Sequence, residues 1–107
     1  DHTRSRSSSF SCARGVKIVF PNEDLHELDV VCLPQGQQPI CIECKSGEFR
    51  RDIDKYLKLR KRLNIDRSRF LICSVDLTQE QAEGLSAMYE LSFVNIQMLK
   101  EHLQKLV

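Results

Sequence analysis

Hydrophobic and polar positions form short blocks along the chain, each of a length that suits one strand or one helix. Runs rich in β-branched and apolar residues predict strands over residues 16–20, 27–33, 39–45, 69–75 and 92–96. Apolar positions at helical spacing predict helices over residues 50–63, 78–91 and 97–106. The expected order is therefore three strands, a helix, a strand, a helix, a strand and a last helix.

An apolar stripe marks the face that each predicted helix should bury. On the first helix it consists of Ile53, Tyr56, Leu57, Leu59 and Leu63, with basic side chains mostly between them. The second helix begins with a capping box, Thr78 followed by Gln81. The other residues expected to be buried are Ala82, Leu85, Met88 and Tyr89 on the second helix, and Met98, Leu99, Leu103 and Leu106 on the third.

The connections between these elements define the fold class. Residues 34–39, "PQGQQP", predict a turn, so the second and third strands should form an antiparallel hairpin. The strand "RFLICSV" is apolar nearly throughout, as expected of a central strand covered on both faces. A hairpin followed by alternating strands and helices predicts an α/β fold, with a mixed central sheet and flanking helices.

Composition bounds the domain organisation. A chain of 107 residues, 41% hydrophobic and 29% charged, suits one compact domain, which we place at residues 16–107. Residues 1–15 are rich in serine and arginine and are expected to be a flexible tail or a truncated terminus. Because the chain begins at Asp1, we expect the C-terminal part of a longer protein, with room for an N-terminal regulatory domain before it.

No apolar run approaches the ~20 residues that cross a bilayer, and no secretion signal is present. We therefore expect a cytoplasmic protein without a membrane partner. Five cysteines are present, and four of them, Cys32, Cys41, Cys44 and Cys73, lie in apolar runs, which favours free, buried thiols and a reducing compartment. The Cys-x-x-Cys spacing of Cys41 and Cys44 is typical of zinc sites, but on a strand these residues point to opposite faces.

The net charge of +1 conceals a strong segregation of charge. Residues 21–44 contain acids but neither lysine nor arginine, whereas basic side chains dominate residues 45–69. The acids of the first segment are Glu23, Asp24, Glu27, Asp29 and Glu43. An acidic site beside a basic surface suits a divalent cation and a phosphodiester together, although a basic run is also typical of a solvated helix face.

Three charged residues lie on strands that otherwise resemble core: Asp29 on the second, and Glu43 and Lys45 on the third. Residues two apart on a strand share a face, so Glu43 and Lys45 should be neighbours. Asp29 joins them only if the hairpin register sets it against Glu43 or Lys45. That register requires an odd loop of about five residues, 34–38 or 35–39.

If the register holds, two carboxylates converge with an ammonium group beside them. Together with the backbone carbonyl of Cys44, the Asp29 and Glu43 carboxylates suit a hard divalent cation such as Mg²⁺ or Mn²⁺. Such a cation activates water and offsets charge at a phosphate, and Lys45 adds a positive charge for the transition state. The set is therefore suited to metal-dependent phosphodiester hydrolysis.

This arrangement resembles the PD-(D/E)xK nuclease superfamily, whose fold is called restriction-endonuclease-like. The resemblance is carried by Asp29 in "ELDVV", by Glu43 and Lys45 in "IECK", and by the predicted order of strands and helices from Val16 onward. Within the superfamily the stretch is most similar to nuclease domains of CRISPR-associated cyclic-oligonucleotide sensors and to Holliday-junction resolvases. The resemblance implies metal-dependent endonuclease cleavage of nucleic acid by Asp29, Glu43 and Lys45, with DNA favoured and RNA as the alternative.

Weaker expectations attach to neighbouring residues. Glu27, two positions before Asp29, is either a supplementary metal ligand or an exposed acid at the rim of the site. His26 is expected to be an ordinary loop histidine, and Tyr56 to be half-buried packing. The side chains expected to contact nucleic acid are Lys55, Arg50, Arg51, Lys58, Arg62 and Ser46.

Three readings remain open from the sequence. The first is the metal-dependent nuclease. The second is an inactive nuclease-like module that binds nucleic acid through residues such as Arg60, Lys61 and Arg62 and is indifferent to Glu43. The third is a protein-interaction or oligomerisation domain whose basic helix meets an acidic protein. The alternative to a catalytic pair is that Glu43 and Lys45 form only a surface ion pair on an exposed strand face, worth ~1 kcal/mol or less. A homodimer is compatible with each of them.

Overall fold

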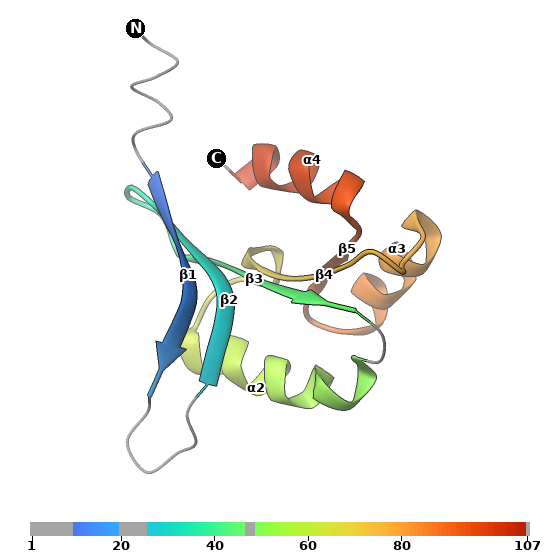
Figure 1. Cartoon of the computed structure of the whole chain (residues 1–107), viewed down its shortest axis with the longest axis horizontal. Helices are drawn as coiled ribbons and strands as arrows, with labels where there is room; N and C mark the ends of the chain where they lie inside the picture. The colour runs from blue at the N-terminus through green and yellow to red at the C-terminus, as the bar shows by residue number, and fades with distance from the viewer. Residues whose placement is uncertain (1–9, 20–25, 47–48, 107) are drawn as a thin grey trace, which may run out of the picture.

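The computed structural model describes residues 10–19, 26–46 and 49–106. Strands and helices follow one another in the predicted order, with two short 3-10 helices in addition (Figure 1). The strands are β1 (Phe10–Ile18), β2 (His26–Pro34), β3 (Ile40–Lys45), β4 (Phe70–Ser74) and β5 (Ser92–Val94). The helices are η1 (Arg50–Asp52), α2 (Ile53–Leu63), η2 (Arg67–Arg69), α3 (Gln79–Met88) and α4 (Ile96–Leu106).

The five strands form one mixed sheet in the order β1-β2-β3-β4-β5. β1, β2 and β3 are antiparallel neighbours, whereas β3, β4 and β5 run parallel to one another. The parallel pairs are connected through α2 and α3, as parallel strands require a crossover. The chain therefore has an α/β fold with a mixed central sheet, as the sequence predicts.

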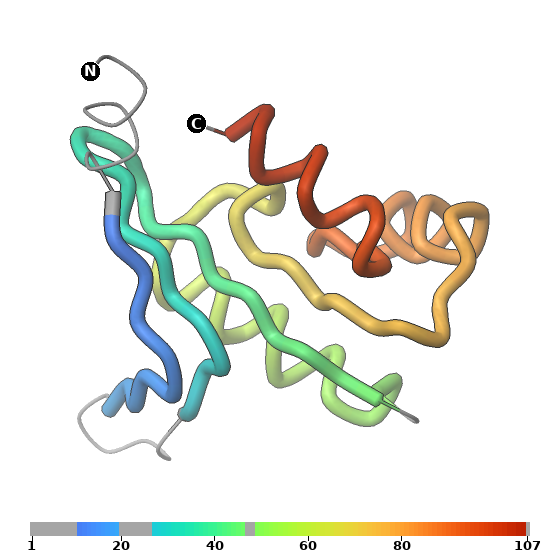
Figure 2. Tube along the Cα trace, turned by 45° about the horizontal axis from the view of Figure 1, so that its top comes forward, coloured from blue at the N-terminus to red at the C-terminus, as the bar shows by residue number. Residues whose placement is uncertain are grey.

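Helices cover both faces of the sheet. α2 and α3 pack over one face around Tyr56, Phe70 and Phe93, and α4 packs over the other around Leu71 and Val94. Figures 1 and 2 show α2 and α4 on opposite sides of the strands. β4 is buried along its whole length because it lies between these layers, which confirms its predicted central position.

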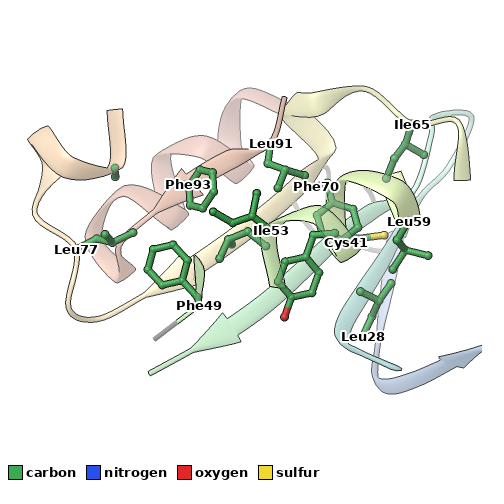
Figure 3. Packing of buried hydrophobic residues seen from close by; sticks show 13 residues of the cluster. Leu28, Cys41, Phe49, Ile53, Leu59, Ile65, Phe70, Leu77, Leu91 and Phe93 are labelled. Atoms are coloured by element: carbon green, nitrogen blue, oxygen red, sulfur yellow. The ribbon is translucent and has the colours of Figure 1, made fainter. Parts of the chain in front are cut away.

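The packing beneath α2 fixes how that helix lies on the sheet. Ile53 and Leu59 point from α2 into the cluster that contains Phe49, Phe70 and Phe93 (Figure 3). Ile53, Tyr56 and Leu59 are buried, and Leu57 and Leu63 pack partly against the same cluster, so the predicted stripe is confirmed. α2 ends at Leu63, and the C-cap residue Asn64 closes the last turn in a left-handed conformation (φ 56°).

The predicted capping box of α3 is present: Gln81 N–H donates to Thr78 Oγ1, and Thr78 N–H donates to Gln81 Oε1. α3 ends at Met88, three residues earlier than predicted from the sequence. Burial of Met88 was predicted wrongly, because its side chain is 73% exposed in this last turn. On α4, Met98, Leu99, Leu103 and Leu106 pack against the core as expected, but none is fully buried.

The N-terminal segment differs from its prediction. β1 begins at Phe10, so residues 10–15 belong to the sheet and not to a tail; residues 1–9 lie outside the described residues. Backbone pairing with β2 forms this strand, although residues 10–15 show no regular alternation of apolar and polar side chains. The same pairing sets Cys12 directly opposite Cys32, and the two form a disulfide.

The expectation that Cys32 is a free thiol is therefore wrong, and cysteine usage does not indicate a reducing compartment. Cys41, Cys44 and Cys73 are free, but only Cys41 and Cys73 are buried. No helix within the described ranges is both long and apolar enough to span a bilayer.

Candidate active site

The hairpin of β2 and β3 has the register that the site requires. Val30 lies opposite Ile42 and Cys32 opposite Ile40, so the next position sets Asp29 in line with Glu43. β2 ends at Pro34 and β3 begins at Ile40, so residues 35–39 connect them, an odd loop of five residues, as predicted. A turn in which Gln37 N–H donates to the Pro34 carbonyl closes the hairpin.

The ladder between β1 and β2 is interrupted at Asp29. Arg14 pairs with Val30 and Val16 pairs with Leu28, but Gly15 and Asp29 between them are not paired. Gly15 has φ +58°, a left-handed conformation that glycine adopts at little cost and that breaks a regular strand. The interruption leaves the Asp29 N–H available for a partner other than β1.

That partner is the Glu43 side chain. Asp29 N–H donates to Glu43 Oε1 at 2.7 Å, and Cys44 N–H donates to Asp29 Oδ2 at 2.8 Å. The two hydrogen bonds cross between the strands, so each carboxylate is held by the backbone of the opposite strand. Asp29 and Glu43, hereafter the acid pair, are therefore brought together as the sequence predicts.

The two acids of the pair occupy different environments. Asp29 is exposed, whereas Glu43 is only 5% exposed on the face of β3 that α2 covers. Burial raises the pKa of Glu43, and the nearby Asp29 charge raises it further, while hydrogen bonds from Asp29 N–H and Tyr56 oppose the shift. A buried carboxylate beside a second carboxylate is the arrangement that a bound cation would stabilise.

Lys45 completes the predicted set but also contacts residues outside it. Its Nζ lies 3.3 Å from Asp52 Oδ2 and 5.7 Å from the centre of the Tyr56 ring. Tyr56 OH in turn donates to Glu43 Oε2 at 3.2 Å. Hydrogen bonding with Tyr56, supported by Asp52, raises the pKa of Lys45 despite partial burial, so the ammonium form is favoured.

Asp52 and Tyr56 are the site residues that the sequence analysis missed. Tyr56 was expected to be half-buried packing, but it is 2% exposed and its hydroxyl contacts Glu43. Their i, i+4 spacing at the start of the helix after "IECK" places both on one helical face, and this was the available signal. The signal was insufficient because it does not show which helical face meets the end of β3.

The predicted nucleic-acid contacts form an exposed surface on η1 and α2. We call Arg50, Arg51, Lys55, Lys58, Lys61 and Arg62 the basic face; all six are exposed. Lys55 Nζ lies 5.2 Å from the centre of the Tyr56 ring, so at Lys55 this surface reaches the residue whose hydroxyl contacts Glu43. Ser46 is also exposed, just beyond Lys45.

Other arginines of the basic segment stabilise the fold instead. Arg60 donates to the Ile65 carbonyl at 3.0 Å and to Glu90 at 2.9 Å, and Arg67 donates to backbone carbonyls of Ser86 and Tyr89. Arg60 therefore does not belong to the basic face, in contrast to its grouping with Lys61 and Arg62 in the sequence analysis.

The remaining predicted residues contribute less. Glu27 is exposed and lies opposite Lys17 of β1 in the strand register, as a rim acid would. Cys44 is exposed and holds Asp29 through its N–H, whereas Cys41 is buried in the cluster beneath α2, so the two thiols do not meet. The expectation that His26 is a loop residue is wrong, because it is the first residue of β2 and lies opposite Ile18; its side chain lies outside the described residues.

The donors available to a metal ion are carboxylate oxygens. Asp29 and Glu43 contact each other through a hydrogen bond, and Asp52 contacts the Lys45 ammonium, so three carboxylates lie in this part of the structure. Among the described residues, no three His, Cys, Asp or Glu side chains are grouped closely enough to hold a metal ion by themselves. The donor type nevertheless fits a hard divalent cation, which commonly binds one or two carboxylates and completes its coordination with water and phosphate oxygens.

Comparison with known proteins gives no further identification. No protein-family model, curated protein or solved structure matches this chain.

Proposed function

We propose that the chain is a metal-dependent endonuclease-type domain that hydrolyses phosphodiester bonds of nucleic acid, with DNA as the favoured substrate. The observation that carries this proposal is the crossed pair of hydrogen bonds that holds Asp29 and Glu43 together. An ion pair formed only for surface stability would not require a 5% exposed glutamate beside a second carboxylate.

The acid pair would hold Mg²⁺ or Mn²⁺. When bound, such a cation would neutralise negative charge on the phosphate and lower the pKa of a coordinated water. Lys45, kept as an ammonium by its neighbours, supplies a positive charge for the oxygens of the phosphorus centre as water attacks and the bond to the leaving oxygen breaks. The basic face, which begins at Lys55 beside Tyr56, supplies phosphate contacts along the substrate backbone.

The finer assignment, a PD-(D/E)xK nuclease with a restriction-endonuclease-like fold, belongs to the same proposal. It is supported by an antiparallel hairpin that carries the acid pair, followed by a helix and a strand parallel to the second hairpin strand. The Glu43-x-Lys45 pair lies at the end of β3 from which α2 departs.

The direct test is cleavage of a supercoiled plasmid with Mn²⁺, with Mg²⁺ or with EDTA. We expect nicked and linear products only with a metal ion, and none from Glu43→Ala or Lys45→Ala proteins that remain folded. Glu101→Ala is a matched control, because Glu101 is an exposed acid on α4, over the opposite face of the sheet. Equal cleavage by wild type and Glu43→Ala would contradict the proposal.

A second candidate, a module that binds nucleic acid without cutting it, is favoured by the exposed basic face. It predicts binding that weakens steeply with salt and does not change in Glu43→Ala. Binding by a wild-type protein that shows no cleavage with either metal ion would favour this candidate over the nuclease.

A further inference from the structure

The position of the Lys45 ammonium group is determined by contacts that lie outside the predicted motif. Lysine has a long, flexible side chain, and Lys45 lies at the last position of β3, where its backbone pairs with Ser74 of β4. Its side chain is nevertheless only 28% exposed, and its Nζ is 3.3 Å from Asp52 Oδ2. The neighbouring elements therefore restrict where the ammonium can lie.

The Asp52 side chain does not cap a helix. Asp52 is the last residue of η1 and directly precedes α2 with a helical backbone (φ -96°, ψ -1°), and its side chain forms no capping hydrogen bond. The Asp52 carboxylate contacts Lys45 Nζ at 3.3 Å instead. The side chain is therefore directed at the candidate active site.

Tyr56 connects the ammonium to the acid pair. Its hydroxyl donates to Glu43 Oε2 at 3.2 Å, and Lys45 Nζ lies 5.7 Å from its ring centre. A phenol hydroxyl can donate one hydrogen bond and accept another, so one group can contact both Glu43 and Lys45. At 2% exposure on a helix anchored by Ile53 and Leu59, the Tyr56 ring has little freedom to move.

We propose that Asp52 and Tyr56 are positioning residues, which together fix the Lys45 ammonium group relative to the Glu43 carboxylate. Asp52 acts from the end of η1 and Tyr56 from the first turn of α2, and neither needs to contact the substrate. This inference rests on the proposed function, because its consequence for catalysis requires that Lys45 acts on a phosphodiester. It goes beyond that function by assigning the geometry of the site to α2 as well as to the hairpin.

The kinetic test compares Asp52→Asn and Tyr56→Phe with wild type in the plasmid assay. Loss of a group that orients an active-site residue typically costs about 10- to 100-fold, so we expect kcat to fall by that factor while KM for DNA changes less than about twofold. Asp52→Glu, which restores the carboxylate, should recover part of the loss. Asp54→Asn is the matched control, since Asp54 is an exposed acid two positions along the chain.

A measurement that does not depend on cleavage uses NMR of the lysine side-chain nitrogen. In wild type we expect an ordered Lys45 ammonium, in contrast to the exposed Lys58. Asp52→Asn should lower the order of Lys45 towards that of Lys58, whereas Asp54→Asn should not. Asp52 is 36% exposed, so this substitution removes charge without opening the core.

The outcomes separate the two proposals. A wild-type protein that never cleaves contradicts the proposed function, and the NMR measurement still decides whether Asp52 and Tyr56 hold Lys45. Unchanged Lys45 order in both Asp52→Asn and Tyr56→Phe overturns the positioning role. If the wild-type protein cleaves, a kcat of Asp52→Asn equal to that of Asp54→Asn overturns it as well.

Discussion

Asp29 donates its backbone N–H to Glu43 Oε1 at 2.7 Å, and its own carboxylate accepts from the backbone N–H of Cys44 at 2.8 Å. Each acid is therefore oriented by the main chain and not only by side-chain rotamers, which removes much of the conformational freedom that two surface acids would have. Two acids held this closely repel each other, so the arrangement is costly unless a cation shares it.

The repulsion between the Asp29 and Glu43 carboxylates leads to a prediction for Glu43→Gln. An amide of the same shape retains the acceptor for Asp29 N–H but removes a buried charge whose pKa is raised by burial. In EDTA at neutral pH we expect Glu43→Gln to be more stable than wild type by ~1 kcal/mol, or roughly 4 to 8 °C in Tm. Cleavage should nevertheless be lost. A lower Tm for Glu43→Gln than for wild type would contradict this reading of the site.

The same pair of proteins predicts a pH dependence. Because the folded state raises the pKa of Glu43 above 4.5, this group's contribution to stability is fully present below pH 4.5 and is lost as the pH rises through the folded pKa. The advantage of Glu43→Gln should therefore be greatest at neutral pH and disappear near pH 4. Thermal melts of both proteins in EDTA between pH 4 and neutral pH measure the difference in Tm. A difference in Tm that does not change with pH would argue against a charged, buried Glu43.

Thiol reactivity tests the placement of the three free cysteines. Burial, with a contribution from the Glu43 charge, raises the pKa of Cys41 to about 12, and burial also raises the pKa of Cys73. Cys44 is exposed. An aromatic disulfide reagent should therefore modify Cys44 in the native protein, and Cys41 and Cys73 only after unfolding. Rapid native modification of Cys41 would contradict its position beneath α2.

The Cys12–Cys32 disulfide should contribute measurably to stability. It links positions separated by 20 in the sequence, and a cross-link of that span stabilises a protein by ~3 kcal/mol in the chain-entropy model. Cys12→Ser should lower the free energy of unfolding by about that amount, and dithiothreitol should have the same effect on wild type. The control is Cys12→Ser, whose free energy of unfolding dithiothreitol should not lower further. If dithiothreitol leaves the free energy of unfolding of wild type unchanged, the disulfide is absent.

Neighbouring cations on α2 should behave differently. Lys58 is exposed on the basic face, so Lys58→Ala should weaken DNA binding. The slope of log K for binding against the logarithm of the salt concentration should become shallower by about 1. Arg60 contacts Ile65 and Glu90, so Arg60→Ala should instead lower stability by ~1 to 2 kcal/mol. DNA binding at several salt concentrations measures the first effect, and denaturant unfolding measures the second. Loss of stability in Lys58→Ala together with loss of DNA binding in a stable Arg60→Ala would contradict these two roles.

The sequence predicted the hairpin and the convergence of Asp29 and Glu43, because strand periodicity and an odd loop are local properties. It did not predict β1 before Val16, since residues 10–15 show no regular apolar period and are held by backbone pairing with β2. The disulfide was missed for the same reason, as Cys12 lay in an unassigned segment. The contacts of Asp52 and Tyr56 depend on the orientation of α2 over β3, a tertiary feature that sequence periodicity does not contain.

The central claim is that Asp29 and Glu43 hold one divalent cation for phosphodiester cleavage. Crystals soaked in Mn²⁺ test it most directly through anomalous scattering. We predict one strong peak bonded to a carboxylate oxygen of each residue, which is lost in crystals of Glu43→Ala grown in the same way. No peak between the two carboxylates at a Mn²⁺ concentration that supports cleavage would contradict the claim.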